Sequence, residues 1–292
     1  MAPPPVSIAI AGAQKSGTTS LLRYLEQHPQ LSGQGPLEIS FFFNEDEWNQ
    51  GWEQCYPKYF YDATTDQLVA KSAMLYARRI CVERLAEHNP GCSVVLILRD
   101  PVERAWSSYR MEREKSWIED PFEHLLTVLE DREDIWNRLF IQFGEYAPAI
   151  RQLYRFFPPD QLKVLLYDDF VSRPLEACRE VFRFVGVDDS YVPETGVAHN
   201  VHREVSSWAA AAVVGWLRRP QNPVRRLAKQ TLPPRVFNRL GSSAVEAIRG
   251  EAVEEQMPGR VRVELGRYYR ELNHELESLL SRDLSHWSGV RD

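Results

Sequence analysis

The residues with the clearest chemical potential form a short loop near the N-terminus, between an apolar run over residues 6–11 and a segment with helical spacing of leucines. The loop contains glycines, one lysine and several hydroxyl side chains, at Gly12, Lys15, Ser16, Gly17, Thr18 and Thr19. A loop of this kind that opens a helix directs backbone N–H groups and the helix N-terminus at one point, which suits a phosphate or sulfate group. We therefore predict an anion-binding loop here.

The loop differs from the nucleoside-triphosphatase pattern at one position that matters chemically. That pattern has Gly, four residues, and then Gly-Lys-Ser/Thr. Gly12 and Gly17 have this spacing, but Thr18 stands where the lysine belongs, and the lysine lies inside the loop as Lys15. We therefore expect an anionic nucleotide to bind here for chemistry other than hydrolysis of ATP.

A second segment could hold a phosphate at the end of another strand. Arg99 follows the apolar run 93–98, and the Asp-Pro pair after it is typical of a helix start. Ser107 lies eight positions beyond Arg99. An arginine fork and a serine hydroxyl can grip one phosphate together. A structural Arg–Asp cap is the alternative, but the Lys15 loop on the same sheet favours a phosphate site.

Strands alternate with helices along the chain, and this alternation must position both segments. The predicted strands are the apolar runs at residues 6–11, 67–70, 93–98 and 162–167. The predicted helices cover residues 17–28, 78–87, 101–115, 121–130, 142–156, 174–185 and 260–281. This order predicts an α/β fold, a P-loop-like three-layer sandwich whose central parallel sheet of four to five strands is flanked by helices. Lys15, Lys71 and Arg99 each follow a strand end, so they would converge at one edge of the sheet.

Composition narrows the function classes. The net charge of −6 and the pI of about 5.7 argue against a basic nucleic-acid-binding surface. No apolar run reaches the roughly 18 residues of a membrane-spanning helix, and the N-terminus lacks the basic region of a signal peptide, so we expect a cytoplasmic protein. The scattered cysteines suit buried thiols, and no His, Cys, Asp or Glu cluster has metal-ligand spacing, so no metal is expected.

We interpret residues 1–292 as a single domain with an irregular part. Prolines and arginines accumulate over residues 190–258, which we expect to form an irregular helical insertion or acceptor-side subregion. The arginine-rich stretch 218–239 is either a solvated face or a surface for an acidic partner or an anionic acceptor.

The two phosphate motifs together resemble those of sulfotransferases that use 3′-phosphoadenosine 5′-phosphosulfate (PAPS). Arg99 and Ser107 match the family's 3′-phosphate pair, and the likeness continues through residues 165–170 and the tail 262–287. The resemblance implies that the loop holds the 5′-phosphosulfate, through Lys15, Ser16, Gly17, Thr18, Thr19 and Ser20.

A closer likeness concerns the reacting centre. Residues 36–43 are similar to the Lys-Glu-Ile-His-Phe-Phe segment of heparan-type glucosaminyl sulfotransferases, which implies that Glu38 is the catalytic base. Leu37 stands where that segment has lysine, which puts the inherited sugar specificity in question. The Ala-Lys-Ser-Ala segment that ends at Ala73 resembles the family's Lys-Ser/Thr-Pro segment, which implies that Lys71 lies beside the reacting atoms.

Further candidates surround this centre. Arg203 is the candidate for the arginine of the family's Lys-Gly-Arg loop, which helps to bind the nucleotide. Trp48, Trp52 and His199 are the candidates for acceptor contact, although the tryptophans could equally pack a loop against the core. His88 precedes an Asn-Pro-Gly turn, and we expect it to be solvated.

The resulting prediction is a sulfotransferase that moves the sulfuryl group from PAPS to a hydroxyl or amine of a small-molecule or glycoconjugate acceptor and releases adenosine 3′,5′-bisphosphate (PAP). Glu38 would accept the proton of the acceptor, and Lys15 would stabilise the leaving nucleotide with the assistance of Lys71. A P-loop nucleotide kinase and a non-catalytic nucleotide-binding module are the alternatives. The sequence predicts no nucleic-acid partner and leaves the acceptor and the oligomeric state open.

Overall fold

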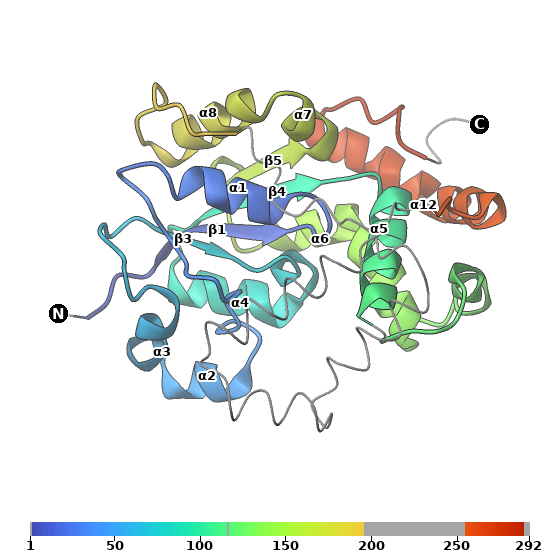
Figure 1. The fold of residues 1–292 in the computed structure, drawn as a ribbon, viewed down its shortest axis with the longest axis horizontal. Helices are drawn as coiled ribbons and strands as arrows, with labels where there is room; N and C mark the ends of the chain where they lie inside the picture. The colour runs from blue at the N-terminus through green and yellow to red at the C-terminus, as the bar shows by residue number, and fades with distance from the viewer. Residues whose placement is uncertain (1, 116, 196–254, 289–292) are drawn as a thin grey trace, which may run out of the picture.

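The protein is seen in a computed structural model that describes residues 2–115, 117–195 and 255–288 (Figure 1). These residues contain one five-stranded sheet in the order β2-β3-β1-β4-β5, and every neighbouring pair is parallel. The strands are β1 Val6–Gly12, β2 Ser32–Gly33, β3 Leu68–Lys71, β4 Ser93–Leu98 and β5 Leu162–Leu166. The parallel α/β fold and its four main strands are thus confirmed, and β2 is an additional short edge strand.

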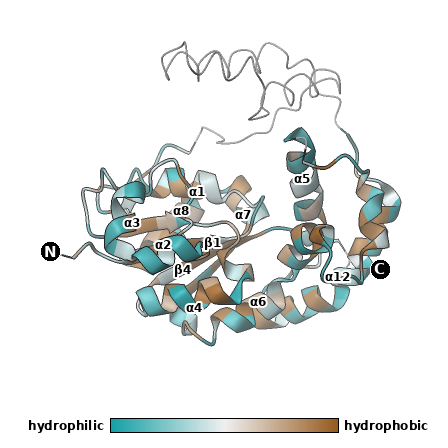
Figure 2. Ribbon diagram, turned by 90° about the horizontal axis from the view of Figure 1, so that it is seen from below, coloured by the Kyte–Doolittle hydropathy of each residue, from teal (hydrophilic) through white to brown (hydrophobic). Residues whose placement is uncertain are grey.

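Helices cover both faces of the sheet (Figure 1). Ile8 and Ile10 of β1 pack on one side in a core with α1 (Thr18–Leu25) and α8 (Pro174–Val185). Ala9 and Ala11 face the other side, in a core with α4 (Arg79–His88) and α6 (Tyr146–Leu153). Figure 2 shows the apolar strands enclosed between helices whose outer faces are more hydrophilic. Burial on both faces explains why the strands are mostly apolar and lack regular polar alternation.

The other helices are α2 Glu45–Gln50, α3 Trp52–Tyr59, α5 Pro101–Glu114, α7 Tyr167–Ser172 and α12 Gly259–Leu280. Short 3₁₀ turns occur at Leu75–Ala77, Phe122–Thr127, Gln142–Gly144 and Pro159–Gln161, and one π-helical turn at Asn137–Ile141. The expected α-helix over 121–130 is therefore wrong, and the one expected over 142–156 begins later, at Tyr146. No sequence pattern had predicted α2, α3 or α7.

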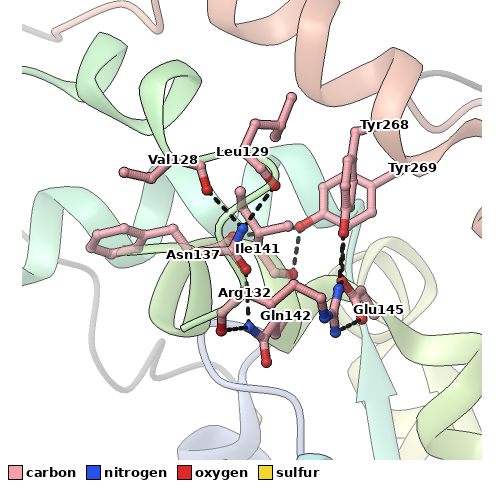
Figure 3. Close-up of polar contacts among 10 residues, drawn as sticks. Val128, Leu129, Arg132, Asn137, Ile141, Gln142, Glu145, Tyr268 and Tyr269 are labelled. Atoms are coloured by element: carbon pink, nitrogen blue, oxygen red, sulfur yellow. Dashed lines mark hydrogen bonds and ion pairs between the residues drawn. The ribbon is translucent and has the colours of Figure 1, made fainter. Parts of the chain in front are cut away.

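Side chains distant in sequence stabilise this irregular region (Figure 3). The amide of Asn137 donates to the carbonyl oxygens of Val128 and Leu129 at 2.9 and 2.8 Å. The hydroxyl of Tyr269 on α12 donates to the Ile141 carbonyl oxygen at 2.7 Å. These bonds satisfy carbonyls that a regular helix would pair internally, which is why the turns are stable without helical periodicity.

An ion pair and a hydrogen bond from α12 stabilise the same region (Figure 3). The guanidinium of Arg132 donates to both carboxylate oxygens of Glu145, at 2.8 and 2.9 Å. The hydroxyl of Tyr268 donates to Glu145 Oε1 at 2.6 Å. Bidentate geometry of this kind fixes orientation as well as distance.

The start of α5 follows the sequence prediction. Oδ1 of Asp100 accepts the N–H groups of Val102 and Glu103, at 2.8 and 3.4 Å. Oδ2 of Asp100 accepts the Ser288 N–H at 2.7 Å, so the same carboxylate also binds the C-terminal tail. This cap fixes the direction of α5 directly beside Arg99.

Within the described ranges, no helix has the length and apolarity to span a bilayer. The same ranges contain no group of three or more His, Cys, Asp or Glu arranged to hold a metal ion. Four buried cysteines, which are Cys55, Cys81, Cys92 and Cys178, are free thiols.

Candidate active site

Three cationic residues lie at the carboxyl ends of neighbouring strands. Lys15 belongs to the loop after β1, Lys71 is the last residue of β3, and Arg99 follows β4. Because β3, β1 and β4 are adjacent and parallel, these ends meet at one edge of the sheet (Figure 1). This is the edge where open α/β sheets bind ligands.

Two glycines shape the loop after β1. A Cβ at Gly12 would lie 2.2 Å from Cδ1 of Tyr76, so the Tyr76 ring leaves no room for a side chain. Gly17 has a φ of +82°, and a Cβ there would lie 2.9 Å from Cε1 of Phe170. Helix α1 begins directly afterwards with no acidic residue in its first turn and, among the described residues, no side-chain cap. The first amides of the helix are thus suited to an anion.

Ser16 gives a direct indication that the loop fits an anionic ligand. Its side chain is buried, and Oγ has no hydrogen-bond partner among the described residues. Buried hydroxyls in folded proteins are nearly always paired. A phosphate or sulfate oxygen in the loop would supply the missing acceptor, so the residues present fit the 5′-phosphosulfate that the motif predicts.

The electrostatics of Lys15 agree with this fit. Burial lowers the pKa of Lys15 to about 8, Glu114 opposes this shift, and the nearby cations Lys115, Arg99 and Arg110 add to it. A positive charge that is disfavoured by burial and by other cations is stabilised when an anion enters the site.

Arg99 is held in place from several sides. Its Nη1 donates to the carbonyl oxygen of Lys15 at 3.2 Å, and its guanidinium lies 4.8 Å from the centre of the Tyr167 ring. The hydroxyl of Tyr146 donates to the Arg99 carbonyl oxygen at 2.9 Å. Arg99 is therefore coupled to the anion loop, as expected for two parts of one nucleotide site.

Ser107 is half-buried on α5, and its neighbour Ser108 makes the contact with the loop. The Ser108 hydroxyl donates to Gln14 Oε1 at 2.9 Å. Helix α5, which carries Ser107, is therefore attached to the anion loop by Ser108.

Glu38 and Lys71 form an ion pair. Lys71 Nζ donates to Glu38 Oε2 at 3.1 Å, and the backbone N–H of Ala73 donates to Glu38 Oε1 at 2.5 Å. The Lys71 side chain is 11% exposed, whereas the Glu38 side chain is 44% exposed. Both carboxylate oxygens are thus held from inside the protein while the group remains accessible to an acceptor.

The aromatic candidates lie in packed surroundings. The Trp52 indole N–H donates to the Pro4 carbonyl oxygen at 2.9 Å. The rings of Trp48 and Trp52 lie 5.0 and 5.2 Å from that of Phe41. These contacts describe packing against the core, and a role of either tryptophan in acceptor binding stays a prediction. His199, Arg203 and the stretch 218–239 lie outside the described residues.

The expectation of a solvated His88 is wrong. Its Nε2 accepts the Val6 N–H at 2.9 Å, and its ring lies 4.7 Å from that of Trp52. Burial lowers the pKa of His88 to about 4. Sequence reasoning also missed Gln34, Tyr76 and Tyr167, which contact the site residues. Only Tyr167 had a signal, its place as the last residue of the predicted strand 162–167.

The family model and two curated proteins that this chain matches are sulfotransferases. A family model described as the sulfotransferase domain matches residues 5–207. The bifunctional heparan sulfate N-deacetylase/N-sulfotransferase 3 of Mus musculus is 29% identical over 209 residues, which cover 66% of this chain and 24% of that protein. Enzyme 4 of the same name and organism is 30% identical over 199 residues, covering 62% and 22%. The chain spans about a quarter of the length of these curated relatives.

Solved structures share the fold. The sulfotransferase from Alicyclobacillus acidocaldarius superimposes with a TM-score of 0.67 at 23% identity, covering 97% of this chain and 98% of that one. The sulfotransferase domain from the curacin biosynthetic pathway gives a TM-score of 0.51 at 16% identity, covering 96% and 99%. At these identities, the likeness concerns the arrangement of strands and helices.

Proposed function

Because the chain belongs to the sulfotransferase family, we propose that it transfers a sulfuryl group from PAPS to a hydroxyl or an amine of a small-molecule or glycoconjugate acceptor. The observation that carries the proposal is the common sheet edge at which the anion loop, Arg99 and the Glu38–Lys71 pair lie. An anion site alone would suit many nucleotide-binding proteins. An accessible carboxylate at the same edge adds a group that can accept a proton.

The nucleotide would be bound at two places. The 5′-phosphosulfate would lie in the anion loop against the amides and side chains of Lys15, Ser16, Gly17, Thr18, Thr19 and Ser20. Arg99 and Ser107 would hold the 3′-phosphate. Each charge-assisted hydrogen bond of this kind contributes about 1.5–3 kcal/mol. The buried Ser16 hydroxyl and the low pKa of Lys15, about 8, both support an anion at this position.

The chemistry assigns a separate role to each charged side chain. Glu38 accepts the proton of the acceptor as the acceptor's oxygen or nitrogen bonds to sulfur. Lys15 donates to the bridging oxygen, which keeps the electron pair when its bond to sulfur breaks and so becomes part of PAP. Lys71 Nζ donates to Glu38 Oε2 at 3.1 Å and so holds the carboxylate in place, and Lys71 assists Lys15 from the next strand.

Two observations bear on the acceptor class. The relatives named above carry heparan sulfate in their names, and an amine acceptor is one option that they suggest. Leu37, directly before Glu38, is 53% exposed and presents apolar surface to an incoming acceptor. We therefore propose a hydroxyl or amine acceptor without specifying a sugar.

We also propose that the chain acts as a single domain over residues 1–292 in the cytoplasm. The support is that the four cysteines are buried free thiols, which suits a reducing compartment.

Nucleotide specificity tests the proposal. PAP at saturating concentration is expected to raise the melting temperature, because it binds only the folded protein. ATP with magnesium is expected to raise it much less. A magnesium-dependent response to ATP without a response to PAP would contradict the proposal and favour a kinase. Incubation with PAPS labelled in the sulfate, against sugars, phenols and lipids, then identifies the acceptor.

A further inference from the structure

Gln34 is a buried amide at the base of the loop that carries Glu38. The residue is only 3% exposed. Its Oε1 accepts the backbone N–H of Lys71 at 2.7 Å, and its Nε2 donates to the Leu37 carbonyl oxygen at 3.0 Å. One side chain therefore joins the backbone of the residue before Glu38 to the backbone of the lysine that pairs with Glu38.

The sheet explains why a side chain is needed here. Strand β2 pairs with β3 only at Ser32 and Gly33, and the Gln34 N–H adds one bond to the Val69 carbonyl oxygen. The chain then leaves the sheet, since the Gly35 N–H donates to the Tyr59 carbonyl oxygen at 2.7 Å. Strand β2 therefore offers no backbone carbonyl oxygen to the N–H of Lys71, and the Gln34 side-chain oxygen accepts that N–H instead.

The other end of the loop has its own anchor. The Ser40 hydroxyl donates to Glu47 Oε1 at 2.8 Å, and the Ser40 N–H donates to the Tyr59 hydroxyl at 3.1 Å. The Tyr59 hydroxyl in turn donates to Glu47 Oε2 at 2.5 Å. The backbone N–H of Ile39 also donates to the Lys71 carbonyl oxygen at 3.2 Å. Loss of the Gln34 amide would therefore loosen only the segment between Gly35 and Ile39, which contains Glu38, while the Ser40 side stays attached.

We propose that Gln34 is a positioning residue that sets the geometry of the Glu38–Lys71 pair. This inference rests on the proposed role of Glu38 as the base. An amide suits the position because it supplies one acceptor and one donor, whereas a carboxylate offers no donor and an apolar chain offers neither. Gln34 itself touches no reacting atom.

The test compares Gln34→Met, which has a similar length and no hydrogen-bonding amide, with Gln34→Glu. The matched control is Gln67→Leu, because Gln67 is exposed and lies directly before the first residue of β3. We expect both Gln34 variants to lower kcat by roughly 10- to 100-fold, because small misplacement of a catalytic group is costly. The KM for PAPS and PAP binding are expected to stay unchanged.

A readout independent of turnover keeps the inference testable. Lys71 is 11% exposed and paired, so acetylation of its amine, followed by mass spectrometry, is expected to be several-fold faster in Gln34→Met than in wild type or in Gln67→Leu. Melting curves with PAP establish that each variant folds.

Unchanged kcat and unchanged Lys71 acetylation in folded Gln34 variants would overturn the inference. Glu38→Gln separates this outcome from failure of the proposed function. If Glu38→Gln is fully active, the proposed base is wrong; if it is inactive while the Gln34 variants match wild type, only the positioning role fails.

Discussion

The pKa of Lys15 leads to a quantitative prediction for nucleotide binding. In the free protein it is about 8, against an ordinary value of 10.5, chiefly because the side chain is buried. This difference corresponds to about 3 kcal/mol of disfavoured charge. An anion in the loop restores the charged form, so binding takes up a proton when Lys15 is neutral beforehand.

The expected effect follows from the fraction of charged Lys15. At pH 7 nearly all free protein carries the charge, whereas at pH 9 roughly one molecule in ten does. The Kd for PAP is therefore expected to rise about tenfold between pH 7 and pH 9. The unfolded chain binds more protons than the native one between the native pKa of about 8 and 10.5, so this lysine makes the free protein more stable as pH rises through that window.

Isothermal titration calorimetry in buffers of different ionisation enthalpy measures both quantities. Proton uptake is expected to be near zero at pH 7 and to approach one proton at pH 9. Lys15→Arg, which stays charged, is expected to lose the pH dependence, and Lys163→Met on β5 is a control that keeps it. A wild-type Kd that is constant from pH 7 to pH 9, without proton uptake, would show that PAP binding does not depend on the charge of Lys15.

Two further predictions concern other charged groups. Arg99→Lys is expected to weaken PAP binding by roughly 10- to 100-fold, because a lysine cannot bind a phosphate with a planar fork. Adenosine 5′-phosphate, which lacks the 3′-phosphate, should bind wild type and Arg99→Lys equally. An equal loss of affinity for both ligands would contradict the role of Arg99 in binding the 3′-phosphate. The free energy of unfolding is expected to fall by about 3 kcal/mol as pH drops from 6.5 to 4, because the unfolded chain protonates His88 at its ordinary pKa of 6.5 while the native pKa is about 4. Urea unfolding at several pH values measures the dependence of the free energy of unfolding on pH. His88→Gln should weaken this dependence, whereas His274→Gln, at an exposed position, should leave it unchanged. The same dependence in His88→Gln as in wild type would contradict the role of His88 burial.

The sheet was predictable because its main strands are largely buried on both faces. Burial on both sides removes the polar alternation that would have obscured the apolar runs, as in β4. Strand β2 was not predictable, because two residues carry no periodicity. The π-helical turn Asn137–Ile141 was equally hidden, since bonds from distant residues such as Tyr269 stabilise it.

The candidate site was predictable where chemistry follows a strand end directly. Lys15, Lys71 and Arg99 all meet this condition, and their common edge follows from parallel pairing. Gln34 does not meet it, because its importance comes from the point at which β2 leaves the sheet. His88 was misjudged because its turn lies on the surface while its ring packs inward against Trp52.

The proposed sulfuryl transfer from PAPS depends on Glu38 as the group that accepts the acceptor's proton. The most direct measurement is single-turnover transfer of labelled sulfate from PAPS by wild type, Glu38→Gln and the control Glu53→Gln, whose carboxylate is exposed on α3. Glu38→Gln is expected to be slower by roughly 10²–10⁴-fold with unchanged PAP affinity, while Glu53→Gln matches wild type. Transfer by Glu38→Gln at the wild-type rate would exclude Glu38 as the base.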